Sequence, residues 1–309
     1  MTSVSLSPLI FFQFTNINLH FLQVKFSVVL LPLNIKIAFQ AVKFSKELDG
    51  EKALSLVEPY LQLSLCCLGM KQFNKAEEYL SLARWIVLTD FNCEDKVRAR
   101  MHMLKGRISI AQGLFDASKP DFADAVYYSS RYYGAESIVS AIGYYRLGDV
   151  FLAQGNVECS LAFFDKVVDI WYKYLSGLNQ SPIIHLALPS ATNPAEVQIV
   201  PIVESLITEQ LTEENLSEGR SQLEIIFDHR KRLLGNSHIA TGLSVTLPYF
   251  MSIPVGEVQY TIGLYEFFLL GNESMAESFI LSALHAYEMQ LGLNHPSCKH
   301  VTTVLVIFP

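Results

Sequence analysis

From about residue 34, apolar residues recur at spacings of three and four along the chain, in segments separated by short turns that contain Gly or Asn. This period is typical of helices that bury one face. Because the connections are short, consecutive segments are predicted to pack as antiparallel helix pairs. The pattern therefore predicts an all-α fold.

A repeat of 42 residues underlies these segments, with frames that begin at Val57, Ala99 and Ala141. A further frame at Glu257 meets the same criteria, and a weaker one lies near Val200. Small residues recur in each frame where two helices would approach closely: Ser64, Gly106 and Gly148 in the first helices, then Ala76, Ser118 and Ser160 twelve residues later, with Ala83, Ala125, Ala276 and Ala283 at related positions. Such periodicity predicts a solenoid of stacked helix pairs.

Glycine recurs sixteen residues after the matched position of the second helix, at Gly50, Gly134, Gly235 and Gly292. Glycine adopts a left-handed backbone conformation without a steric penalty, and it therefore often follows the last residue of a helix. We expect these four glycines to end helices.

The repeat pattern predicts one helical domain over residues 34–300. Residues 1–33 are apolar with a single charge, match neither helical nor strand periodicity, and are expected to be a poorly ordered, non-homologous leader; residues 301–309 are expected to be a tail. Two stretches, Gly177–Pro194 and Thr241–Gly256, interrupt the repeats. Insertions of this length in a compact array are usually disordered or functional.

The repeats resemble the tetratricopeptide repeat (TPR), in the longer form found in kinesin light chains. The positions that carry this resemblance are Tyr60, Leu63 and Ser64; Tyr144, Leu147, Gly148, Phe151, Gly155 and Phe164; and Ala76 with Ala83. The resemblance covers roughly residues 34–295. It implies a right-handed α-solenoid whose first helices line an inner, protein-binding groove.

Two longer segments resemble the family of zinc finger MYND domain-containing protein 12. They are Leu56–Leu65 followed by Lys75–Leu88, and Gly143–Phe151 followed by Asp165–Leu175. This resemblance implies a cytoplasmic and cytoskeletal scaffold in motile cilia or flagella, beside axonemal dynein. The family's N-terminal zinc finger is missing, because residues 1–33 contain no cysteine. The alternative is a kinesin-light-chain-like cargo adaptor, which would have an upstream heptad coiled coil that these 309 residues lack.

Charge and cysteine usage narrow the partners and the compartment. With 30 acidic and 23 basic residues, the net charge of −7 does not favour binding to phosphate backbones, so no nucleic-acid partner is expected. Polar residues interrupt the apolar N-terminal stretch, so no membrane partner is expected. Five cysteines without paired spacing indicate reduced thiols in the cytosol.

The chain carries none of the common catalytic motifs: no Gly-x-Ser-x-Gly, Walker loop, Gly-x-Gly-x-x-Gly or His-Glu-x-x-His. Cys66 and Cys67 are adjacent on a predicted helix, where neighbours point about 100° apart and do not readily share one metal. Further ligand types gather near the C-terminus at His285, His295, Cys298 and His300. His295-Pro296 resembles an inter-helix turn of the kinesin-light-chain repeats, so we expect no metal at these residues. Because the catalytic motifs are missing, we also expect a non-enzymatic protein without a cofactor.

The groove-facing positions of the frames at Ala99 and Ala141 supply the candidate partner-binding residues. They are Arg100, Met103, Arg107, Tyr145, Asp149 and Leu152. Two guanidinium groups on one wall suit acidic side chains or a peptide terminus, and an apolar groove suits an amphipathic helix. The expected partner is therefore such a protein segment, by resemblance an axonemal dynein component or another TPR protein. Two alternatives stay open: that the apolar positions only pack between repeats, and that the chain is an enzyme of an unrecognised type.

Overall fold

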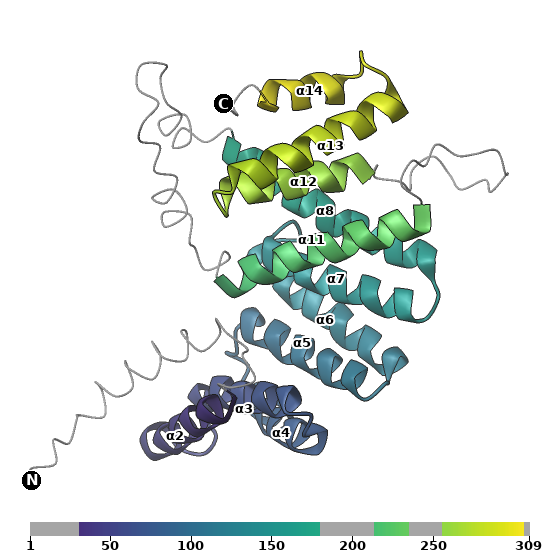
Figure 1. The fold of residues 1–309 in the computed structure, drawn as a ribbon. Coiled ribbons are helices and arrows are strands. Elements are labelled where there is room, and N and C mark those ends of the chain that lie inside the picture. Colours follow the sequence, from purple (N-terminus) through teal and green to yellow (C-terminus); the bar gives the residue numbers. More distant parts are fainter. Residues whose placement is uncertain (1–30, 180–212, 235–254, 306–309) are drawn as a thin grey trace, which may run out of the picture. The chain divides into compact units, whose positions relative to one another are not determined.

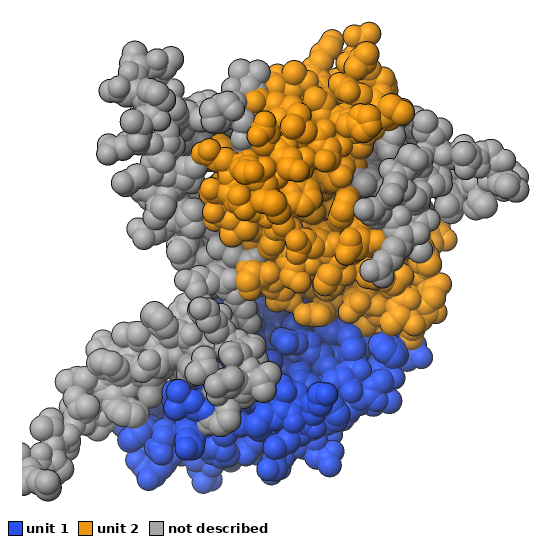
Figure 2. All heavy atoms as spheres, viewed as in Figure 1, with its two compact units in different colours: residues 1–135 blue, residues 136–309 orange. Residues whose placement is uncertain are grey.

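The computed structural model describes residues 31–179, 213–234 and 255–305, and the regular structure of these residues is entirely helical (Figure 1). The predicted all-α fold is thus confirmed. The chain divides into two compact units, Met1–Ala135 (unit 1) and Glu136–Pro309 (unit 2), as Figure 2 shows. The helical domain predicted for residues 34–300 therefore spans two units. Of the predicted leader, only the part from Leu31 onward is described, and it is helical.

Unit 1 consists of a leading helix followed by two helix pairs. Its elements are α2 (Leu31–Asp49), the 3-10 helix η1 (Leu54–Leu56), α3 (Val57–Gly69), α4 (Phe73–Thr89), α5 (Asp95–Ala111) and α6 (Phe115–Tyr133). Helix α3 pairs with α4, helix α5 pairs with α6, and α5 also packs on both α3 and α4. The frames predicted at Val57 and Ala99 are therefore confirmed as successive layers of one stack.

Unit 2 continues the pattern with two pairs and two further helices. Its elements are α7 (Ile138–Ala153), α8 (Val157–Asn179), α11 (Glu213–Leu234), α12 (Val255–Phe268), α13 (Glu273–Leu291) and α14 (Pro296–Leu305). Helices α7 and α8 form one pair, α12 and α13 form another, and α14 packs on α13. The frames predicted at Ala141 and Glu257 are confirmed.

Among the described residues, the weaker frame near Val200 does not form a separate layer. Helix α12 packs directly against α8, as α5 packs against α4 in unit 1, so the layer formed by α7 and α8 is followed at once by α12 and α13. Helix α11, the described part of that frame, packs instead against α7 and α12. Repeat matching failed here because α11 shares the small-residue and glycine spacing but not the stacking.

The structure also moves three predicted boundaries. Gly177 lies inside α8 and Gly256 inside α12, so the two predicted insertions are shorter than expected, and their remaining residues lie outside the described ranges. The predicted tail begins inside α14, where Val301 and Val304 are buried against the rest of unit 2. The helical spacing of apolar residues therefore continues through Val301 and Val304.

Close approach at small residues holds each pair together. A Cβ at Gly106 would lie 2.6 Å from the Phe122 ring, and one at Gly148 would lie 2.7 Å from the Phe164 ring. In the first frame, the Ser64 hydroxyl donates to the carbonyl oxygen of Ala76 at 2.7 Å. The predicted register of the first three frames is therefore confirmed.

The predicted helix-ending glycines are confirmed at three of four positions. Gly50, Gly134 and Gly292 follow the last residues of α2, α6 and α13 with φ values of 89°, 98° and 84°. These values lie in the region that favours glycine. Gly235 lies outside the described residues.

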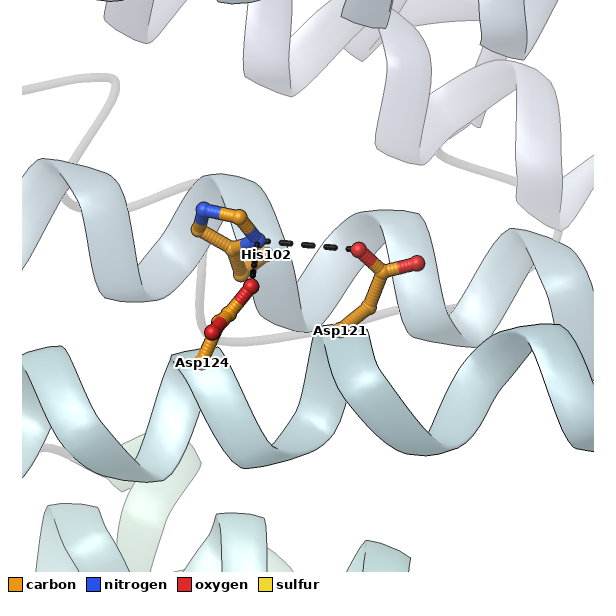
Figure 3. A group of neighbouring side chains, drawn as sticks. All are labelled: His102, Asp121 and Asp124. Carbon is orange, nitrogen blue, oxygen red and sulfur yellow. Dashed lines mark ion pairs between the residues drawn. The ribbon is translucent and has the colours of Figure 1, made fainter.

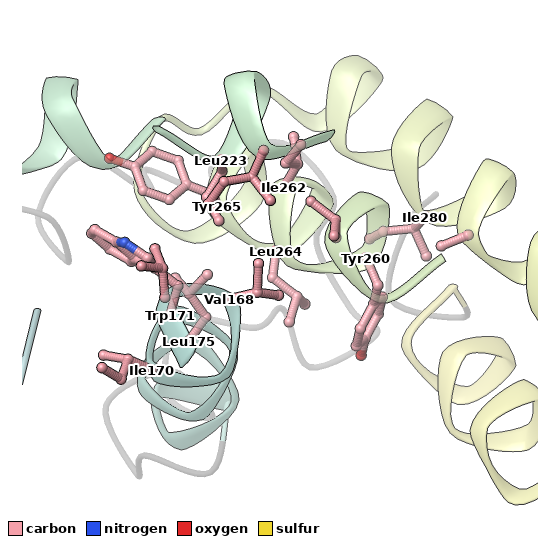
Figure 4. Close-up of a cluster of buried hydrophobic side chains, with 14 of the residues drawn as sticks. Val168, Ile170, Trp171, Leu175, Leu223, Tyr260, Ile262, Leu264, Tyr265 and Ile280 are labelled. Atoms are coloured by element: carbon pink, nitrogen blue, oxygen red, sulfur yellow. The ribbon is translucent and has the colours of Figure 1, made fainter. Parts of the chain in front are cut away.

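Each unit has its own apolar core. In unit 1 the core joins α2, α3, α4 and α5. In unit 2 it centres on Trp171, whose ring meets Tyr265 edge-on at 5.2 Å between centroids, with Leu223 of α11 nearby (Figure 4). Among the described residues, no helix is both long and apolar enough to span a bilayer.

Replacing Ala76 or Ala83 by leucine is expected to destabilise unit 1 by about 1–3 kcal/mol, because both side chains are fully buried and added methylenes have no room. Denaturant unfolding followed by circular dichroism measures the change. Ser81→Leu, at an exposed position of the same helix, is the control. An unchanged midpoint for both alanine variants would contradict the close contact.

Candidate functional site

The candidate partner-binding residues lie on two first helices in different units. Helix α5 of unit 1 carries Arg100, Met103 and Arg107, and helix α7 of unit 2 carries the remaining three. Each group is a separate feature of its own unit.

In unit 1 the guanidinium of Arg100 pairs with a carboxylate of the preceding repeat. Arg100 Nη1 lies 2.8 Å from Glu58 Oε2, and the two side chains are 43% and 35% exposed. Glu58 also accepts a hydrogen bond from Gln62 Nε2 at 3.0 Å. Glu58 and Arg100 are 42 residues apart, so they hold the same position in successive repeats and link α3 to α5. The sequence pattern predicts that Arg100 pairs with an acidic side chain of a partner protein. In the structure, Arg100 pairs with Glu58 of its own chain.

Half-buried apolar side chains accompany this ion pair. Met103 and Arg107 lie three and seven residues after Arg100, on the same face of α5, and both are half-buried. On α3, Leu65 and Leu68 are half-buried and pack at the margin of the unit 1 core. We call the residues Glu58, Leu65, Leu68, Arg100, Met103 and Arg107 the first-helix wall of unit 1.

In unit 2, Tyr145 is a core residue, and the expectation that it is exposed on a groove is wrong. Its side chain is 5% exposed and packs on Phe164 at 5.7 Å between ring centroids. Burial, together with the nearby Asp149 carboxylate, raises the pKa of Tyr145 to about 12. Asp149 and Leu152 are half-buried, and Leu152 packs against the core. Any partner surface of α7 therefore excludes Tyr145.

A charged cluster between α5 and α6 was not found in the sequence. His102 Nδ1 lies 3.6 Å from both Asp121 Oδ1 and Asp124 Oδ2 (Figure 3). Lys105 Nζ lies 2.7 Å from the same Asp121 oxygen, and the His102 ring stacks on Tyr128. The cluster joins the two helices of one pair.

Asp121 is buried, and burial alone would raise its pKa; the hydrogen bond that Lys105 donates and the nearby His102 ring outweigh burial and lower the pKa. A carboxyl group whose pKa is lowered by folding stabilises the protein above its unfolded-state pKa. That contribution is lost as the pH falls through the folded-state pKa.

Asp121→Asn is accordingly expected to reduce the stability of unit 1 at pH 7 by about 1–3 kcal/mol, because the buried position loses the charge that pairs with Lys105 and His102. The difference from wild type should begin to shrink as the pH falls below the unfolded-state pKa of about 4, and it should disappear below the lower folded-state pKa, where the folded wild-type carboxyl is protonated. Asp124→Asn, at a side chain 54% exposed, is the matched control and should have little effect. Equal effects of the two substitutions on unfolding would contradict this account.

The same cluster is the place where the described residues could hold a metal ion. One donor atom each of His102, Asp121 and Asp124 lies within 4.8 Å of the others. However, the Lys105 ammonium already binds Asp121 and supplies the positive charge that a cation would bring. The geometry favours an ion-pair cluster over a metal centre.

Two of the C-terminal ligand-type residues, His295 and Cys298, make contacts within a turn, whereas His285 and His300 are exposed. All five cysteines are free thiols, and burial raises the pKa of Cys66 to about 11. Cys298 is buried, with its sulfur 3.4 Å from the carbonyl oxygen of Gly292, and His295 Nδ1 accepts from the amide of Ser297. His295 and Cys298 thus support the turn between α13 and α14.

We expect the purified protein to contain no stoichiometric zinc, because its cysteines lack ligand spacing and Lys105 occupies the His102 cluster. Elemental analysis after extensive dialysis measures the metal content. About one mole of zinc per chain, lost in His102→Ala or in Cys298→Ala, would overturn this expectation and identify the ligands.

Comparison with known proteins adds one structural likeness. No protein-family model matches the chain. The structure of BtubC (BKLC) from P. vanneervenii is similar with a TM-score of 0.41 and 14% sequence identity, over 86% of this chain and 94% of that chain. At this level the likeness carries no argument about function. The functional proposal therefore rests on the residues of the chain itself.

Proposed function

We propose that the protein is a non-enzymatic scaffold or adaptor of the TPR kind, and that the first-helix wall of unit 1 binds an acidic, amphipathic helix of a partner protein. The observation that carries this proposal is the placement of Arg100. Its guanidinium is partly exposed beside half-buried apolar side chains, and within the described part of the chain it pairs with the half-buried carboxylate of Glu58.

Exchange of this carboxylate for one of a partner would cost little. Surface ion pairs contribute about 0–1 kcal/mol, so Glu58 competes weakly. A guanidinium binds a carboxylate through two parallel hydrogen bonds, which fixes the orientation of an incoming side chain. The apolar residues Leu65, Leu68 and Met103 would meet the apolar face of the same helix.

The cellular setting that we propose is the axoneme of motile cilia or flagella, beside axonemal dynein. The support for it is the resemblance of Leu56–Leu65, Lys75–Leu88, Gly143–Phe151 and Asp165–Leu175 to the family of zinc finger MYND domain-containing protein 12. A role that needs the zinc finger is not part of the proposal.

Affinity purification of the tagged full chain from ciliated cells, followed by quantitative mass spectrometry, tests this function. We expect enrichment of an axonemal dynein component or of a second TPR protein over a tag-only control. Enrichment of kinesin motor subunits would instead support a cargo adaptor. The absence of any enriched protein would contradict a scaffold role.

A further inference from the structure

Helix α11 is an additional element on the stack of unit 2. The layers formed by α7 with α8 and by α12 with α13 contact each other directly, so their stacking does not require α11 between them. Helix α11 packs beside the first helices α7 and α12. It is joined to α8 and α12 by residues 180–212 and 235–254, whereas the turns within the two pairs span only residues 154–156 and 269–272. The chain on either side of α11 is thus much longer than the turns within the two pairs.

An amphipathic face attaches α11 to this surface. The positions that face unit 2 are buried and follow a helical period: Gly219, Gln222, Leu223, Ile226 and Arg230. The opposite face is exposed at Ser217, Ser221, Glu224, Ile225 and Asp228. Gly219 lies so close to Trp171 of α8 that a Cβ there would overlap the indole ring, and Leu223 lies near Tyr265 of α12 (Figure 4). The surface beneath α11 is thus shaped for a helix with glycine at one position.

Charged side chains match α11 to each of its three neighbours. Glu218 Oε1 lies 2.8 Å from Arg146 Nη2 of α7, and Arg220 Nη2 lies 2.6 Å from Glu266 Oε1 of α12. Further along, buried Arg230 pairs with Asp165 of α8. Buried pairs of this kind add little net stability when compared with apolar packing, but a wrong charge opposite any of them is costly. The pairs therefore select which helix binds, rather than making its binding tight.

Two buried polar side chains in this interface lack hydrogen-bond partners among the described residues. Gln222 is 2% exposed, and neither its side-chain oxygen nor its nitrogen has a hydrogen-bond partner among the described residues. The indole nitrogen of Trp171 is buried without a partner in the same part of the chain. The amide of Gln222 would be hydrated if α11 left the surface, so its burial opposes docking.

From these contacts we infer that the surface of α7, α8 and α12 beneath α11 is an exchangeable helix-binding site, which α11 fills within its own chain. Its ligand class is an amphipathic helix with the α11 pattern: an acidic residue, a glycine and a basic residue in succession, then apolar residues four and seven positions after the glycine. A partner helix of this chemistry binds when α11 is displaced. The inference concerns unit 2 alone and does not depend on the first-helix wall of unit 1.

A fluorescent peptide of residues 213–234 tests the site against the full chain. In Gly219→Leu the chain's own α11 collides with Trp171, while the residues of the site are unchanged. The fraction of molecules whose site is not filled by α11 therefore rises. This variant should bind the peptide at least about tenfold more tightly than wild type does. Gln222→Leu removes the unpaired amide from α11 and should bind the peptide more weakly than wild type. Fluorescence anisotropy measures all three affinities.

Two controls separate specific docking from exposure of apolar surface. The peptide that itself carries Gly219→Leu should not bind, and the Arg220→Glu peptide should bind only a chain in which Glu266→Arg accompanies Gly219→Leu. If Gly219→Leu loses helical circular dichroism, Arg220→Glu, which adds no bulk, is the opening variant. Failure of both opening variants to gain affinity for the peptide, or equal binding of the Gly219→Leu peptide, would overturn the proposal.

Discussion

Replacing Trp171 by alanine is expected to lower the free energy of unfolding of unit 2 by about 3–5 kcal/mol. The side chain is 1% exposed and stands where α8, α11 and α12 meet, in contact with Tyr265 and against Gly219. Its removal leaves a cavity that three helices would have to close together. Urea unfolding followed by far-ultraviolet circular dichroism measures the loss.

The chain has one other tryptophan, which provides a matched control. Trp85 on α4 is 47% exposed, and its ring is covered on one side by the ammonium of Lys52 at 5.4 Å. Trp85→Ala is expected to change stability by no more than about 1 kcal/mol, because it removes little buried surface. Equal destabilisation by the two substitutions would show that Trp171 is not the centre of the unit 2 core.

Reversing Arg100 and Arg107 to glutamate is expected to abolish partner capture. Loss of a charged pair in a protein interface costs about 2–5 kcal/mol, which corresponds to about thirtyfold or more in affinity. The fold should persist, because the Arg100 ion pair with Glu58 is partly exposed and such pairs contribute little to stability; circular dichroism of the double variant, which also replaces half-buried Arg107, checks this. Quantitative co-purification of the partner from ciliated cells measures the loss.

The control reverses the same amount of charge on the second helix of the neighbouring pair. Lys75 and Arg84 lie on α4 at exposed positions, away from the first-helix wall. Lys75→Glu with Arg84→Glu should leave capture unchanged. Recovery of the partner at the wild-type level by the folded Arg100 and Arg107 variant would place the binding surface elsewhere.

The elements that the sequence predicts well are those fixed by short-range contacts. Ser64 meets Ala76, and Gly106 meets Phe122, within a single helix pair, so the spacing of small residues sets the register directly. The glycines after α2 and α6 are also local signals, because glycine adopts a positive φ without the steric cost that other residues incur.

The burial of Tyr145 was not predicted from its position in the repeat. Tyr145 has the groove position of its frame, yet it packs on Phe164, and Phe164 in turn stacks with His229 of α11. Repeat spacing cannot reveal this arrangement, since α11 packs beside the stacked pairs rather than within one of them. The Glu58–Arg100 pair, in contrast, could have been predicted from the sequence, because the two residues hold equivalent positions 42 residues apart.

The His102 cluster could have been found from the register. Gly106 contacts Phe122, and the helices of a pair are antiparallel, so a step back along α5 corresponds to a step forward along α6. His102, four residues before Gly106, then falls level with Val126, within one helical turn of Asp124, which it contacts in the structure. The signal is a histidine and two aspartates at matched positions of facing helices, which no motif within one helix displays.

Site-specific photo-crosslinking tests the central claim, that the first-helix wall of unit 1 binds a protein partner. A benzophenone amino acid would replace Met103 in this wall or Leu82 on the exposed face of α4, and each full-length chain would be irradiated in ciliated cells. The account predicts a discrete adduct with one protein from position 103 and none from position 82. An adduct from position 82 alone, with none from position 103, would contradict it.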